Sequence, residues 1–149
     1  MIDRFLFFVI LSIFYSQLIN IFETVLWIRG FWKIKPPFPT SKGDVKNEGY
    51  HLLLAFLYFM PFTFLEPEFI KTIPWAWLVW ILNDVTWHFW SVYPRYWKKW
   101  IIFYFNPRLN VVLWFARFLI VKVKVTPRRM FYITLIRLMV LPFLFMFMV

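Results

Sequence analysis

Two long apolar runs constrain this chain more than any other feature of its sequence. The first runs from Phe5 to Ile28 and the second from Phe131 to Val149. Both approach the length of about 20 residues that an α-helix needs to cross the hydrocarbon core of a bilayer. Hydrophobic residues make up 62% of the 149 residues, and a soluble domain of this size has too little polar surface to cover them. The sequence therefore predicts an integral membrane protein.

Two shorter apolar stretches predict two further spans. A polar loop, residues 29–48, precedes the first of them, and the acidic tripeptide Glu66-Pro67-Glu68 separates the two. We therefore expect an all-α fold of about four transmembrane helices in a single domain, residues 1–149. The predicted spans are residues 5–28, 49–65, 73–92 and 131–149.

Small and polar side chains recur at helical spacing along the first span. They are Ser12, Ser16, Asn20, Glu23 and Thr24. Membrane helices use such faces to pack against one another. This face of the first span is therefore expected to contact protein and not lipid.

The stretch from Pro94 to Met130 has a different pattern, with nine Lys or Arg and no acid. We predict that residues 94–130 form a basic amphipathic segment in the headgroup layer, mainly an interfacial helix. Its anchors would be Trp97, Trp100 and Trp114. Residues 121–125, Val-Lys-Val-Lys-Val, alternate with period two, which is typical of a short extended strand. A fifth span through this region is the alternative.

The distribution of charge predicts the orientation of the bundle. Residues 29–48 hold five basic residues and residues 94–130 hold nine, whereas residues 66–72 hold two acids and one Lys. The positive-inside rule places both basic regions in the cytoplasm and both termini outside, in a multi-pass protein of the plasma membrane. Contacts with lipid headgroups, and not with nucleic acid, would then account for the net charge of +10. The cations predicted to make these contacts are Arg95, Lys98, Lys99, Arg108, Arg128 and Arg129.

Ionisable side chains lie inside the predicted spans. Asp84 and His88 are four residues apart, so a helix would place them on one face. Glu23, His51 and Arg137 fall at a similar depth, within about 12 Å of the inner boundary at about 1.5 Å of rise per residue. Such groups are costly in a membrane and indicate a functional site. Four spans would thus contribute to one polar layer.

One hypothesis is that this layer is a structural clasp. A carboxylate in lipid needs a charged partner, so Asp84 or Glu23 would pair with Arg137. The histidines would then bond to neighbouring backbone or Trp groups. In this interpretation the polar layer holds the four helices together.

A second hypothesis is a metal centre. His51, Asp84 and His88, with Glu23 or Asn83, would bind copper, iron or zinc, because imidazole and carboxylate ligands suit these ions. The chain has no cysteine, which excludes Fe–S clusters and thiolate zinc sites. A third hypothesis makes the two histidines the axial ligands of a b-type haem.

One short motif resembles a known family. Asn83-Asp84 followed by Trp87-His88-Phe89-Trp90 resembles a membrane helix in the C subunit of the copper membrane monooxygenases, which oxidise ammonia and methane. The resemblance covers about nine of the 149 residues. It implies that Asn83 and His88 belong to a copper site, with Asp84 and His88 at a copper-ligand spacing. Residues 93–107 contain no histidine, so His51 is the candidate for a further ligand.

These features favour a small polytopic subunit, accessory and not itself catalytic, in a larger membrane complex such as a copper monooxygenase. Its partners would be other membrane subunits. The alternative is a metal-binding membrane enzyme that uses copper or another transition metal at His51, Asp84 and His88. A third possibility is a proton or ion conduit through Glu23, Asp84 and His88. The outer halves of the later spans are almost wholly apolar, which disfavours a conduit.

Overall fold

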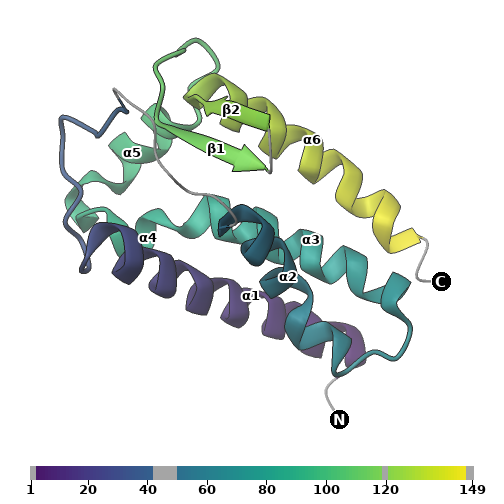
Figure 1. The fold of residues 1–149 in the computed structure, drawn as a ribbon. Coiled ribbons are helices and arrows are strands. Elements are labelled where there is room, and N and C mark those ends of the chain that lie inside the picture. Colours follow the sequence, from purple (N-terminus) through teal and green to yellow (C-terminus); the bar gives the residue numbers. More distant parts are fainter. Residues whose placement is uncertain (1–2, 42–49, 119–120, 147–149) are drawn as a thin grey trace.

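The computed structural model describes residues 3–41, 50–118 and 121–146, and the chain is mostly helical (Figure 1). A short π-helical turn, Thr24–Ile28, extends the first helix, and a 3-10 turn, Pro94–Tyr96, precedes α5. The remaining elements, in chain order, are α1 (Arg4–Glu23), α2 (Tyr50–Thr63), α3 (Phe69–Thr86), α4 (His88–Ser91), α5 (Trp97–Tyr104), β1 (Trp114–Phe118), β2 (Val121–Val125) and α6 (Pro127–Met146).

Among the residues that the structure describes, two helices are long and apolar enough to cross a membrane. They are Arg4–Ile28 and Pro127–Met146, and they overlap the first and last predicted spans, of which residues 147–149 lie outside the described residues. Only 28% of the most apolar 18 residues of the first helix and 17% of those of the second are buried. Most of their apolar side chains therefore lie on the outside of the bundle, unlike those of a core helix in a soluble protein. The predicted second and third spans overlap α2, which has 14 residues, and α3, which has 18, but neither of these helices meets the same criterion of length and hydropathy.

Helix α3 is the centre of the bundle, because α1, α2 and α6 all pack against it (Figure 1). The face of α1 that meets the bundle is the polar stripe, and Ser12, Ser16, Asn20 and Thr24 are completely buried. The prediction that this stripe contacts protein is confirmed. Small side chains at this spacing allow the backbones of two helices to approach closely.

An aromatic cluster fills one half of the bundle. Trp75 of α3 is 1% exposed. Its ring lies 5.2 Å from Phe8 of α1, 6.5 Å from Phe62 of α2 and 4.8 Å from Phe145 of α6. One side chain of the central helix therefore contacts all three surrounding helices in this half.

The prediction that residues 94–130 form mainly an interfacial helix is largely wrong. Helix α5 ends at Tyr104, before Pro107, and β1 and β2 form an antiparallel pair in which the backbone of Trp114 pairs with that of Val125 and the backbone of Phe118 with that of Val121. Proline lacks an N–H donor and disfavours helix in the residue before it, which explains why the helix does not continue. The fold is thus not wholly α-helical. The prediction of a strand at residues 121–125 is confirmed.

The Trp anchors also differ from the prediction. Trp100 is 3% exposed and belongs to a second apolar cluster with Val92, Tyr104 and Leu113. It therefore packs inside the protein and does not anchor the chain in the headgroup layer. The cations predicted to contact headgroups are all exposed: Arg95, Lys98, Lys99, Arg108, Arg128 and Arg129.

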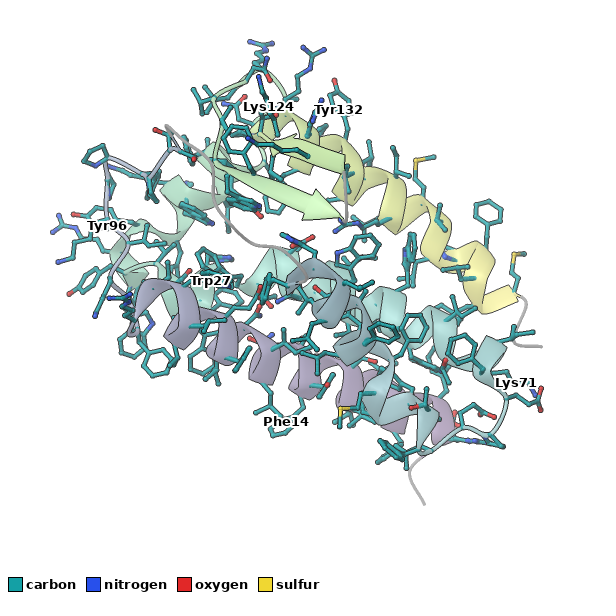
Figure 2. All side chains as sticks on the ribbon, in the orientation of Figure 1. Phe14, Trp27, Lys71, Tyr96, Lys124 and Tyr132 are labelled. Carbon is teal, nitrogen blue, oxygen red and sulfur yellow. The ribbon has the colours of Figure 1, made fainter. Side chains whose placement is uncertain are left out.

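The two ends of the bundle differ in charge. Figure 2 shows Tyr96 and Lys124 near one end and Lys71, in the first turn of α3, at the other. The end with α5 and the hairpin carries most of the exposed cations. At the opposite end, Arg4 bonds to Glu66 at 2.8 Å and Lys71 to Glu68 at 2.9 Å.

Replacement of Trp75 by alanine tests the aromatic cluster. We expect Trp75→Ala to lower the free energy of unfolding by about 3–5 kcal/mol, because truncating a buried Trp leaves a cavity and removes its packing contacts. Thermal unfolding of the detergent-solubilised chain measures the effect. Phe64→Ala is the control, since Phe64 is 80% exposed, and equal stability of the two variants would contradict the role of Trp75.

Candidate functional site

A cavity of about 670 Å³ lies between α2, α3, α6 and the hairpin. Its walls are mostly apolar and rich in aromatic rings. Several lining residues bring hydrogen-bonding or charged groups into it, among them Glu23, Tyr50, His51, Asn83, Asp84 and Arg137. Five of these six belong to the polar layer or the short motif identified in the sequence.

Asp84 and Arg137 form an ion pair in this cavity, in which Arg137 Nη1 donates to Asp84 Oδ2. The side chain of Arg137 is 9% exposed and that of Asp84 is 22% exposed. The guanidinium also lies 3.6 Å from the centre of the Trp80 ring, one turn before Asp84 on α3, which is a favourable cation–π geometry. The Trp77 indole donates to the Arg137 carbonyl at 3.0 Å. These contacts join α3 to α6.

Asn83, the residue before Asp84, joins α3 to the other two long helices. Its side-chain amide donates to Asn20 Oδ1 and to Glu23 Oε2 of α1, both at 2.7 Å. Its own oxygen accepts a bond of 2.7 Å from the Tyr58 hydroxyl of α2. The Tyr50 hydroxyl of α2 donates to the other oxygen of Glu23. Asn83 is 2% exposed, and all of its amide hydrogen-bonding groups are used.

A second set of polar contacts extends this network toward α4. Thr86 accepts bonds from Gln17 at 2.8 Å and from Asn20 at 2.9 Å. The Trp90 indole donates to Gln17 Oε1 at 2.9 Å. Polar side chains of α1 are therefore joined to α3 and α4 over almost two turns.

The two histidines lie in different surroundings. His51 lines the cavity that also contains Asp84. His88 Nδ1 lies 2.9 Å from the Val85 carbonyl of the preceding turn, and its ring packs against Phe89 and Trp97. His88 is not among the residues that line the cavity. His88 thus lies outside the cavity that His51 and Asp84 share.

The rest of the predicted metal set does share the cavity. Glu23, Asn83, Asp84 and His51 all line it, but Glu23 and Asp84 are bonded to protein donors. Within the described residues there is no group of three His, Cys, Asp or Glu side chains arranged to hold a metal ion. Copper, iron, zinc or haem binding remains a prediction.

The contributors to the layer that were not predicted include Tyr50 and Trp80. Tyr50 precedes His51 and bonds to Glu23, and Trp80 packs on Arg137. Trp80 lies four residues before Asp84, so its place on the same helix face was a usable signal. Tyr50 gave a weaker signal, because its acceptor is distant in the sequence.

Tyr104 of α5 lines the end of the cavity near the hairpin and is 4% exposed. Its ring stacks between Trp100, at 5.3 Å, and Trp114, at 5.8 Å. Burial, and to a smaller extent the negative charges of Asp84 and Glu23, raise the pKa of the Tyr104 phenol well above its usual range. This end of the cavity therefore presents a neutral hydroxyl.

No family model, no curated protein and no solved structure matches this chain. The arguments about function therefore rest on the contacts described above.

A double-mutant cycle at Asp84 and Arg137 tests the ion pair. Arg137→Met leaves a carboxylate with no cationic partner, so we expect a loss of about 3 kcal/mol in the free energy of unfolding. The double variant D84N/R137M should lose clearly less than the sum of the single variants, because the orphaned charge is gone. Chemical denaturation in detergent measures the free energy of unfolding of D84N, R137M and D84N/R137M.

Arg128→Met is the matched control, since it removes an exposed cation from the first turn of the same helix. It should change the stability by less than about 0.5 kcal/mol. Additive losses at Asp84 and Arg137, or a loss in R137M no larger than in R128M, would refute the pairing.

Proposed function

We propose that this chain is a four-span protein of the plasma membrane and a small, non-catalytic subunit of a larger membrane complex. One observation carries the proposal. The carboxylates and the guanidinium of the polar layer are bonded to other helices of this same chain. Groups engaged in this way hold helices together, which favours a packing role for the layer.

The exposed apolar surface supports the membrane assignment. Phe14 of α1, Phe56 of α2 and Phe143 of α6 are 63%, 68% and 62% exposed, and Figure 2 shows Phe14 pointing away from the bundle. Polar side chains such as Ser12 and Asn20 are meanwhile completely buried. A bilayer favours this arrangement, in which apolar groups lie on the outside and hydrogen-bonded polar groups on the inside.

The charge distribution supports the proposed orientation. The end with α5 and the hairpin is basic, and the connection between α2 and α3 contains Glu66 and Glu68. The positive-inside rule then places the basic end in the cytoplasm and the α2–α3 connection and both chain ends outside. Figure 1 shows the start of α1 and the end of α6 on the side of the bundle away from α5.

The aromatic cluster disfavours a proton or ion conduit. A conduit would need a polar path from Asp84 toward the outer face, whereas Phe8, Phe62 and Trp75 pack together in that half of the bundle. We therefore favour a packing role. The resemblance around Asn83 and His88 makes a copper monooxygenase one kind of complex to which such a subunit would belong.

Cysteine labelling tests the four-span topology, and the chain has no cysteine of its own. We expect Glu68→Cys, in the α2–α3 connection, to react with a membrane-impermeant maleimide on intact cells. Arg108→Cys, between α5 and β1, should react only after permeabilisation. Phe14→Cys serves as the control within the bilayer and should react under neither condition. Labelling of Glu68→Cys and Arg108→Cys from the same side would exclude four spans.

Site-specific crosslinking tests the subunit role. We expect a photoreactive benzoylphenylalanine at Phe14, Phe56 or Phe143 to give a discrete protein adduct from one helix face and lipid adducts from the others. The adducts are separated on gels after irradiation of native membranes. A stable complex should also remain intact during native electrophoresis in mild detergent. It should then migrate at a mass well above the 18.6 kDa of the chain alone. Lipid adducts from all three positions would contradict the proposal.

A further inference from the structure

The cavity reaches the surface of the bundle. Ala55 on α2, Phe69 at the start of α3 and Ile133 on α6 all line it and are all exposed. Since α2 and α6 pack on α3, the open side faces the surroundings of the bundle between these two helices. In a four-span protein those surroundings are the acyl chains of the bilayer. The volume of about 670 Å³ lies within the roughly 300–1,000 Å³ range of ligand pockets.

The cavity extends along most of α3. Its lining residues on α3 run from Phe69 to Asp84. At about 1.5 Å per residue this corresponds to about 22 Å along the helix, more than half of a hydrocarbon core of about 30 Å. The cavity therefore has the length to take an extended acyl chain.

The end of the cavity at the hairpin carries two cations. Lys124 of β2 and Arg129 of α6 both line it and both are exposed. Arg129 Nη1 donates to the Lys124 carbonyl at 2.7 Å, which places the two residues side by side. Within the described part of the chain, neither has an acidic partner. The two acids of the cavity, Glu23 and Asp84, are bonded to Tyr50 and Asn83 and to Arg137, respectively.

We propose that this cavity binds one anionic phospholipid, with an acyl chain along α3 between α2 and α6 and the phosphate on Lys124 and Arg129. Two features argue for this occupant. An apolar cavity that opens into a bilayer is filled by the chains around it, and a pair of cations with no acidic partner among the described residues selects a negative headgroup. The site is more specific than the general headgroup contacts expected of cations such as Lys98.

Native mass spectrometry of the full chain, released from non-lipid detergent micelles, tests the proposal. The probes are dioleoyl phosphatidylglycerol, which is anionic, and dioleoyl phosphatidylcholine, which has no net charge. We expect one phosphatidylglycerol per chain, bound at least tenfold more tightly than phosphatidylcholine. The variant K124E/R129E should abolish this preference, and the milder K124Q/R129Q should reduce it several-fold.

Matched variants separate the cavity from the basic surface in general. K98E/K99E removes two exposed cations of α5 that do not line the cavity and should leave the preference unchanged. Ala55→Trp should block the apolar part and weaken binding of both lipids, whereas Leu53→Trp, at an exposed position outside the cavity, should not. Circular dichroism and thermal unfolding confirm that each variant is folded.

The opposite results would overturn the proposal. These are equal affinity for the two lipids, loss of the preference in K98E/K99E to the same extent as in K124E/R129E, or binding that Ala55→Trp leaves intact. Occupation by a partner helix is also distinguishable. A benzoylphenylalanine at Ala55 would then form a protein adduct in native membranes where a bound lipid gives a lipid adduct.

Discussion

Asn83 and Asp84 are adjacent on the central helix, and together they bond to all three of the other long helices. Successive residues of an α-helix point about 100° apart, so neighbouring side chains can serve two different sides of the bundle. Asn83 bonds to Asn20 and Glu23 of α1 and to Tyr58 of α2. Asp84 pairs with Arg137 of α6. The packing of α1, α2 and α6 around α3 depends on this pair of residues.

The surroundings of the chain determine how much these hydrogen bonds contribute to the association of the helices. Between apolar helices in lipid, burial of apolar surface provides little driving force, so packing and hydrogen bonds decide which helices associate. Trp75 supplies packing to three helices in one half of the bundle, and Asn83 and Asp84 supply polar contacts about two turns further along α3. Both layers contact α6, through Phe145 in the first and Arg137 in the second, although most of α6 is exposed.

The sequence predicted the elements whose pattern is local. The apolar runs indicated the helices Arg4–Ile28 and Pro127–Met146, and the alternation at residues 121–125 indicated β2. The stripe from Ser12 to Thr24 indicated a buried face because its spacing is helical. The free-energy cost of a charge in a membrane indicated that Asp84 or Glu23 would pair with Arg137, and the structure shows Asp84 as the partner.

Other features depended on contacts that are distant in sequence. Nothing near Trp114 indicates a strand, because β1 forms only by pairing with β2. Trp100 resembled a headgroup anchor, but it packs in the cluster with Val92 and Leu113. His88 has the spacing to join Asp84, yet α3 ends at Thr86 and the His88 ring bonds to the Val85 carbonyl. Helical spacing thus limits which side chains can meet but does not decide which acceptor a ring takes.

The hairpin gives the basic end a shape that an interfacial helix would not have provided. A helix lying flat would spread its cations over the headgroup layer, where each would contact whichever lipid was nearest. The strand β2 instead places Lys124 beside Arg129 at the end of a cavity that reaches down α3. The change from helix to strand after Pro107 therefore replaces part of a diffuse basic surface with a localised pair of charges at the end of the cavity.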